Sequence, residues 1–275
     1  MAVRMDQLSW KEFAERSHQP VILPIGSTEQ HGQHLPMGVD TILAECIATD
    51  LAERIDGTLM PTLSYGYKSR PQSGGGPLFP GTIDLNGSTV IAQVRDVLRE
   101  LIDDGFRNIL VLNAHFENEA FILEAIDLVN RETGGVATVV ETNWWDPLTP
   151  HDMEAIFDGL PFPGWALEHA AVTETSLMLH YAPELVHLDR VPTDTGTSFA
   201  PAPYVRYPVR PGDVPAHGGL ASPAGASAER GQLIVEACMR AVVSICEQEF
   251  VGRQPEHPAL EPQVIEELKT IGTAS

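Results

Sequence analysis

Two short segments of this chain each place a carboxylate and an imidazole two residues apart: Glu29 with His31, and His115 with Glu117. Each pair follows a short apolar run that is typical of a buried β-strand. In extended backbone, side chains at positions i and i+2 point to the same side, so both members of a pair can reach one point. The spacing therefore predicts that each pair binds at a shared site.

A fifth candidate ligand, Asp40, lies just beyond the first pair. With Asp40, the chain offers three carboxylates and two imidazoles, which is a suitable ligand set for two divalent metals with one carboxylate bridging them. Taken alone, Asp40 also fits an N-cap, because it begins a helical pattern. Beside the other four residues the metal interpretation is favoured, and it predicts a hydrolase that uses two metals.

The pattern around these residues alternates between strand-like and helix-like segments. They follow one another at 21–26, 40–55, 59–63, 88–104, 108–113, 118–133 and 136–141. Such alternation predicts an α/β domain in which a mostly parallel β-sheet has helices on both faces. In open sheets of this type, sites form beyond the carboxyl ends of strands, which is where both pairs lie.

Longer irregular segments interrupt the alternation. The glycine- and proline-rich segment 69–81 is long enough to fold over a site. The segment 144–165 is rich in aromatic and turn residues, and we interpret 192–226 as an ordered excursion or an oligomer contact. The run 227–250 predicts a long amphipathic helix. We expect the whole chain to be one domain, with 256–275 as a loose tail.

The composition argues against several classes of function. The net charge of -21 excludes nucleic acid as a partner, because a phosphate backbone demands a surface rich in lysine and arginine. No stretch approaches the ~20 apolar residues of a membrane helix, and the first residues do not resemble a secretory signal. Cys46, Cys238 and Cys246 show no pairing pattern, so we expect structural thiols and a reducing, cytoplasmic location.

The segment 164–176 contains a candidate proton carrier, His169. We expect His169 to open a helix, whose positive end favours the neutral imidazole. A neutral imidazole can take a proton from the attacking water and return it to a leaving nitrogen. Glu174 is too far along to orient His169 locally, but it can reach the metal region or the groups that support it. The alternatives are a helix-capping histidine and a surface glutamate.

Three tryptophans lie in segments without a regular pattern: Trp144, Trp145 and Trp165. Aromatic faces at a site suit a flat or cationic ligand through stacking and cation–π contact. The alternative is that they fill the core. Core filling is favoured for Trp144, and both interpretations stay open for the other two.

Further polar residues accompany the two pairs. Asn113 and Asn118 flank the second pair, and we expect them to brace the backbone or the ligands, as metal sites need oriented outer groups. His34 follows the first pair; it either supports a ligand or is a core histidine with satisfied nitrogens, and the second interpretation is favoured.

Together these segments resemble the creatininase (creatinine amidohydrolase) family over most of the chain. The metal motifs that match are Pro24-Ile-Gly-Ser-Thr-Glu29-Gln-His31-Gly with Asp40, and Asn113-Ala-His115-Phe116-Glu117-Asn118. Closer matches to the creatininases proper are Tyr65-Gly-Tyr-Lys-Ser, Ser73-Gly-Gly-Gly, Phe79-Pro-Gly, Trp145-Asp, Gly164-Trp165, Glu168-His169, Glu174-Thr-Ser-Leu-Met-Leu and Asp189-Arg-Val.

The resemblance implies a fold, cofactors and roles for single residues. The fold is a creatininase-like set of α/β/α layers, and the cofactors are two divalent metals, Zn²⁺ or Mn²⁺. One metal would be held by Glu29, Asp40 and His115, and the other by His31, Asp40 and Glu117, with Asp40 bridging. The substrate positions would be Ser73, Phe116, Trp165, Ala166 and His169, with Trp145 closing over the ring. The creatininases proper are hexamers, so the resemblance also implies a homohexamer.

The chain departs from the creatininase pattern at three positions. It has Phe116 where the pattern has tyrosine, Ala166 where it has aspartate, and Ala114 where it has glycine. The first two remove polar groups near the substrate. A site that loses a hydrogen-bonding partner can change specificity while its metal chemistry survives.

The sequence therefore predicts a metal-dependent hydrolase of a small-molecule amide. The first hypothesis is reversible hydrolysis of the cyclic amide of creatinine to creatine, with His169 carrying the proton and Glu117 sharing the base role. The second is the same centre acting on another amide, such as a formamide, a lactam or a sugar-derived substrate. The third is a metal-binding structural or regulatory protein without catalysis.

Overall fold

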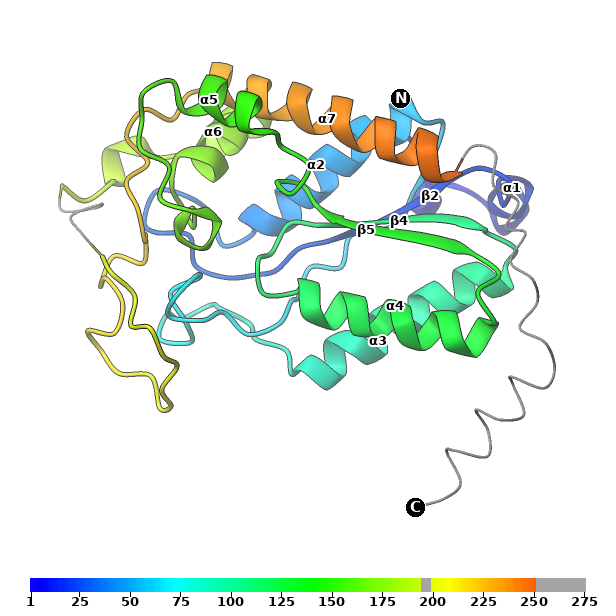
Figure 1. The fold of residues 1–275 in the computed structure, drawn as a ribbon, viewed down its shortest axis with the longest axis horizontal. Helices are drawn as coiled ribbons and strands as arrows, with labels where there is room; N and C mark the ends of the chain where they lie inside the picture. The colour runs from blue at the N-terminus through cyan, green and yellow to red at the C-terminus, as the bar shows by residue number, and fades with distance from the viewer. Residues whose placement is uncertain (194–198, 251–275) are drawn as a thin grey trace.

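A five-stranded β-sheet forms the middle layer of the molecule, and every pair of neighbouring strands in it is parallel (Figure 1). In spatial order the strands are β1 (Val3–Arg4), β3 (Thr58–Leu59), β2 (Val21–Ile25), β4 (Asn108–Asn113) and β5 (Thr138–Asn143). This fold is that of residues 1–193 and 199–250, which a computed structural model describes. It confirms the predicted parallel α/β class.

Helices cover both faces of the sheet (Figure 1). On one face lie α2 (Val39–Arg54), α5 (Pro150–Phe157), α6 (Val172–Tyr181) and α7 (Ala228–Phe250), and on the other lie α3 (Gly87–Asp103) and α4 (Glu119–Thr133). The short helix α1 (Trp10–Glu15) precedes β2. Four 3₁₀ turns complete the described elements: Met5–Gln7, Trp165–Leu167, Pro183–Leu185 and Leu188–Arg190.

The strand β2 and residues 109–112 of β4 are apolar because both faces of these strands are covered by helices. Ile22 and Leu110 point into the core beneath α2, α6 and α7. Val21, Leu23 and Ile109 point into a second core beneath α3 and α4. Side chains alternate between these two cores, so β2 and β4 read as continuous hydrophobic runs.

The register of β2 and β4 brings the two carboxylate–imidazole pairs to one edge of the sheet. Ile25, the last residue of β2, lies opposite Asn113, the last residue of β4. Glu29 therefore follows its strand end by four residues and His115 follows its own by two. The carboxyl ends of neighbouring parallel strands meet at the same edge, where sites form in such sheets.

The strands and helices that were predicted agree with the structure to within a few residues, except at β3. The helix α5 was not predicted, since it lies in the segment 144–165 that was expected to be irregular. A strand was expected over 59–63, but β3 covers only Thr58–Leu59, and one isolated bridge joins Leu63 to Ile25. Pro61 lies inside the expected range, and a proline has no N–H to donate to a ladder. The strand therefore ends before it.

The long helix α7 packs closely on α6 at Gly231. A Cβ at this position would overlap the carbonyl oxygen of Ser176 and would crowd His180. We expect Gly231→Ala to lower the free energy of unfolding by about 1–3 kcal/mol, because overpacking forces the two helices apart. Chemical denaturation would measure the loss. Gly38→Ala is the control, since a Cβ there meets only Ile42, at 3.8 Å; equal losses in the two variants would contradict this account.

The cysteine predictions are confirmed where the structure describes them. Cys238 and Cys246 both lie on the buried side of α7, and all three thiols are free. The expected loose tail, 256–275, lies outside the described residues, as does part of the predicted excursion, 194–198. Among the described helices, none has both the length and the apolar character that crossing a membrane requires.

Candidate metal centre and substrate pocket

The two pairs and Asp40 form one buried cluster at the carboxyl edge of the sheet. His115 Nδ1 lies 3.2 Å from Glu29 Oε1 and 3.1 Å from Asp40 Oδ2. His31 Nε2 lies 3.0 Å from Asp40 Oδ1. Asp40 thus lies beside both imidazoles, and it does so from the first turn of α2. Asp40 therefore belongs to the cluster and is not merely a residue at the start of a helix.

Both imidazoles use one ring nitrogen for the backbone and direct the other at carboxylates. His31 Nδ1 donates to the carbonyl oxygen of Glu29 at 3.2 Å, and His115 Nε2 donates to that of Tyr67 at 2.9 Å. A metal-binding histidine usually donates its other N–H to an oxygen in this way, which fixes the ring and leaves one lone pair for the metal. His31 Nε2 and His115 Nδ1 are the nitrogens left for a metal.

The electrostatics of the cluster favour an added cation. Burial raises the pKa of Glu29 to about 7. Although burial opposes it, the surrounding carboxylates raise the pKa of both His31 and His115 well above the ordinary value. For Asp40, burial disfavours the charge, but the two imidazoles outweigh burial and hold its pKa below the usual range. Protons thus neutralise part of the buried negative charge, and a divalent metal would displace them.

Several of the nitrogen and oxygen atoms that could bind a metal have no hydrogen-bond partner among the described residues. They are Glu29 Oε2, His31 Nε2, Asp40 Oδ2 and Glu117 Oε2. An unsatisfied buried polar atom is costly unless something binds it. The donors are nitrogens of histidine and oxygens of carboxylates, which Zn²⁺ and Mn²⁺ accept. The residues therefore fit two divalent metals.

Glu117 lies beside Nε2 of His115, whereas Asp40 lies beside Nδ1. Its Oε2 lies 3.5 Å from His115 Nε2, and its donor atoms group with those of Glu29 and His115. The assignment of Glu117 to one metal with His31 and Asp40 is what the resemblance implies. The glycine-rich segment holds the other carboxylate oxygen of Glu117: Ser73 Oγ donates to Oε1 at 2.5 Å, and the Arg70 N–H donates to it at 3.2 Å.

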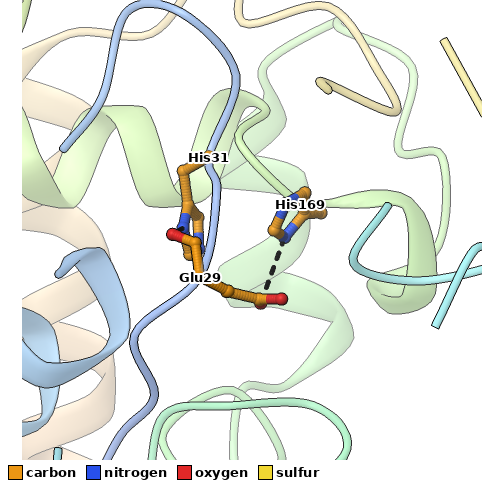
Figure 2. Close-up of side chains that lie close together, drawn as sticks. All are labelled: Glu29, His31 and His169. Atoms are coloured by element: carbon orange, nitrogen blue, oxygen red, sulfur yellow. Dashed lines mark hydrogen bonds and ion pairs between the residues drawn. The ribbon is translucent and has the colours of Figure 1, made fainter. Parts of the chain in front are cut away.

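His169 lies beside Glu29 and His31 (Figure 2). Its Nδ1 lies 3.6 Å from Glu29 Oε1, and its ring centroid lies 4.4 Å from that of His31. The prediction that His169 opens a helix is wrong: α6 begins at Val172, and His169 lies in the bend before it. Burial, followed by the nearby His31, lowers the pKa of His169 well below the ordinary value. The neutral imidazole is therefore favoured by burial, and not by the positive end of a helix as expected.

Glu174 connects this bend to the metal cluster. Ala170 has a left-handed backbone, φ +56°, and its N–H donates to Glu174 Oε2 at 2.6 Å. A left-handed conformation is strained for alanine, so it needs such support. The same Oε2 lies 3.6 Å from His31 Nε2. Glu174 is neither a surface residue nor remote from His169, because the bend brings the chain back to its side chain.

Aromatic side chains form the wall beside the cluster. Trp145 and Phe116 are stacked with ring centroids 6.1 Å apart and planes 21° apart. Trp145 and Trp165 are 6.2 Å and 32° apart, and Trp144 meets both of them edge-on. All four rings line a pocket that also contains Glu29, His115, Glu117 and His169. Trp144 is at the same time part of the hydrophobic core.

Comparison with known proteins places this site in a family. The family model for creatininase, described as creatinine amidohydrolase, matches residues 6–246. The creatinine amidohydrolase of Pseudomonas putida is 42% identical over 258 residues, which cover 90% of this chain and 98% of that protein. The chain belongs to the creatininase family.

Solved structures of creatininases match this family member over almost their whole length. A creatininase variant complexed with creatine aligns with a TM-score of 0.87 at 40% identity, covering 92% of this chain and all of that one. A manganese form of creatininase aligns with a TM-score of 0.86 at 41% identity and the same coverage. A more distant relative, the 3-dehydro-scyllo-inosose hydrolase of Thermotoga maritima, is 27% identical over 74% of this chain and 64% of its own length.

The predicted substrate positions of this creatininase-family chain do not all reach the pocket. Ser73, Phe116, Trp145, Trp165 and His169 line it. Ala166 does not; it lies in the 3₁₀ turn after Trp165 and is half-buried there. A methyl side chain is too short to extend from this turn into the pocket, so Ala166 contributes only through the backbone that carries Trp165.

The asparagines and His34 hold the backbone around the cluster. Asn113 Nδ2 donates to the carbonyl oxygen of His115 at 2.8 Å, and Asn118 Nδ2 donates to that of Gly26 at 3.1 Å. His34 is buried, and its Nε2 lies 3.1 Å from Thr175 Oγ1. Burial, then the nearby His31, lowers the pKa of His34 to about 4.

Sequence reasoning missed two polar residues of the site, Gln30 and Glu168. The side chain of Gln30 reaches His169. Glu168 lines the pocket, and burial raises its pKa to about 7; Oε2 accepts from Thr173, and Oε1 has no partner among the described residues. Both residues stand next to a predicted site residue, and both lie within the segments that carry the family resemblance. Their position beside those residues was the available signal.

Proposed function

We propose that this chain hydrolyses the cyclic amide of creatinine reversibly to creatine with two divalent metals, Zn²⁺ or Mn²⁺. The observation that carries the proposal is the buried donor set of Glu29, His31, Asp40 and His115 against an aromatic pocket. The creatinine amidohydrolase of Pseudomonas putida, 42% identical to this chain, supports the substrate. Creatininase structures of a Zn-Zn type and with Mn support the metals.

The residues of the cluster bind the metals and orient the reacting groups. When bound, the two metals polarise the amide carbonyl and activate the attacking water. Glu29, Asp40 and His115 would hold one metal, and His31, Asp40 and Glu117 the other. Glu117 keeps one carboxylate oxygen on Ser73 and directs the other at the cluster, so it can serve as a ligand and accept a proton from the water.

His169 would carry the proton to the leaving group. Its Nδ1 faces the cluster at 3.6 Å from Glu29 Oε1, close to where the scissile amide would sit. Glu117 would take the proton that the attacking water loses; as His169 passes its Nδ1 proton to the departing ring nitrogen, that proton would be returned to Nδ1, so both groups end as they began. The burial that keeps the imidazole neutral suits this exchange.

Trp145, Trp165 and Phe116 would bind the flat ring and keep water out. A ring stacked between two aromatic planes needs them about 7 Å apart, because each contact takes about 3.5 Å. The ring centroids of Trp145 and Trp165 are 6.2 Å apart and their planes are tilted by 32°, so the two rings must separate and become more parallel to admit a ring between them. Glu168, with a free carboxylate oxygen in the pocket, can accept hydrogen bonds from an amino group on the substrate.

A second function is favoured by the missing polar groups of the pocket. Phe116 has no hydroxyl, and Ala166 has no polar side chain, at positions where the creatininase pattern has tyrosine and aspartate. Under this alternative the same metals and His169 act on another amide, such as a formamide, a lactam or a sugar-derived substrate. The chemistry would be the same and only the recognition would differ.

We also propose a homohexamer and a cytoplasmic location. The hexamer is supported by the resemblance to the creatininases proper. The location is supported by the three free thiols, which a reducing compartment maintains.

The test of the function is creatinine turnover by protein that has been stripped of metal and then re-supplied with Zn²⁺ or Mn²⁺. We expect no activity in the stripped protein, activity after either metal, and creatine as the product, identified by chromatography. Full activity in the stripped protein would overturn the metal mechanism. Tight metal binding with no creatinine turnover but hydrolysis of another amide would decide for the second function. Failure on a broad amide panel would leave a metal-binding protein without catalysis.

A further inference from the structure

Gln30 stands between two cluster residues in the sequence, but its side chain serves a different part of the site. It is 5% exposed and reaches three segments that lie far apart in the chain. Its Nε2 lies 3.0 Å from the carbonyl oxygen of Gly74, 2.9 Å from that of Gly218 and 2.9 Å from His169 Nε2. Its Oε1 accepts from the Gly32 N–H at 2.9 Å. One amide thus joins the glycine-rich segment, the bend that carries His169, and the segment before α7.

The surrounding backbone fits closely around this amide. A Cβ on Gly218 would collide with Gln30 Oε1, and a Cβ on Gly75 would lie 2.5 Å from Gln30 Nε2. Both glycines have positive φ, +87° and +84°, which favours glycine independently of the space. Two glycines from different segments therefore enclose the carboxamide in a fitted cradle.

The orientation of the amide follows from its neighbours. Two carbonyl oxygens require the NH₂ group on their side, and the Gly32 N–H requires the oxygen on the other. An amide nitrogen donates but does not accept. The NH₂ group has two N–H bonds for three neighbours, so it shares them among the two carbonyl oxygens and His169 Nε2. A proton on His169 Nε2 would point at this donor group, so the proton of the neutral ring lies on Nδ1. Nδ1 is the atom that faces the metal cluster.

We propose that Gln30 is a positioning residue that fixes the ring orientation and the tautomer of His169 and holds the glycine-rich segment against it. The inference rests on the proposed function for the role of His169, and on the hydrogen bonds and the glycine cradle for that of Gln30. Gln30 has no contact with the reacting atoms. It acts by keeping the proton of His169 on the nitrogen that faces the substrate.

The test compares Gln30→Met with Gln72→Met in the Zn²⁺-loaded protein. Methionine has nearly the shape of glutamine but cannot donate, so Gln30→Met fills the cradle and frees His169. Gln72 is the matched control, because its Nε2 also joins the glycine-rich segment to a later one, through the carbonyl oxygen of Tyr204 at 3.0 Å, but at an exposed place. The readouts are metal content, kcat and KM for creatinine, and the ¹⁵N shifts of the His169 ring, assigned with His169→Asn.

We expect Gln30→Met to keep its metals, to lose kcat by about 100-fold with KM within a factor of about three, and to show a mixture of His169 tautomers. Gln72→Met should match the wild type in all readouts. Equal losses in both variants would mean that the amide only ties two segments together, and would overturn the proposal. So would loss of metal in Gln30→Met, or an unchanged tautomer. If the wild type fails to hydrolyse creatinine, the proposed function fails, and the ¹⁵N shifts still decide the role of Gln30.

Discussion

Asp40→Asn will abolish both metal binding and hydrolysis, with kcat/KM falling by about 10³-fold or more. Asp40 is the only cluster residue whose two oxygens face two different imidazoles within the described chain, His31 at 3.0 Å and His115 at 3.1 Å. Asparagine keeps the shape but replaces one oxygen by an NH₂ group that cannot bind a cation. It also removes one negative charge from a buried site that needs it to hold divalent metals.

The measurement is metal content by mass spectrometry together with creatinine turnover, with Asp50→Asn as the control. Asp50 lies on the same helix, α2, where it accepts from the hydroxyl of Tyr181 at 2.7 Å. Asparagine can still accept there through its amide oxygen, so the control should keep its metals and its activity. An Asp40→Asn protein that retained two metals per chain and near-normal kcat would contradict the bridging role.

His169→Asn will lower kcat by about 10²–10⁴-fold while both metals stay bound. The imidazole is the group that exchanges a proton at Nδ1, and asparagine has no titrating atom to replace it. The metal donors Glu29, His31 and Asp40 keep their contacts, because His169 faces them from a separate segment. We therefore expect the loss in turnover without a loss of metal.

Metal content measured beside kcat decides between two roles of His169. Its donor atom lies close enough to those of Glu29 and His31 to share a metal with them. Loss of one metal in His169→Asn would make it a ligand and would contradict its role as proton carrier. His151→Asn is the control, since His151 is exposed at the start of α5 and should be replaceable without effect.

Local patterns in the sequence were enough to predict most of the fold. The apolar runs of β2 and β4, the helical periodicity between them and the turn-rich segments are short-range features, and they predicted the parallel α/β class correctly. The i, i+2 spacing of Glu29 with His31 and of His115 with Glu117 is equally local. For this reason the four residues and Asp40 could be recognised as a candidate metal set before their positions were known.

The tertiary structure determined the contacts between segments that are distant in the chain. The register that sets Ile25 opposite Asn113 brings the two pairs to one edge, and no local pattern specifies a register between strands that are more than eighty residues apart. His169 reaches the cluster through a bend with a left-handed Ala170, where local propensity favoured a helix. No local pattern marks the role of Gln30 at the site; this role depends on the three chain segments that meet around its amide. Residue types and short spacings therefore determined which groups could do the chemistry, and packing over long sequence separations determined where each one points.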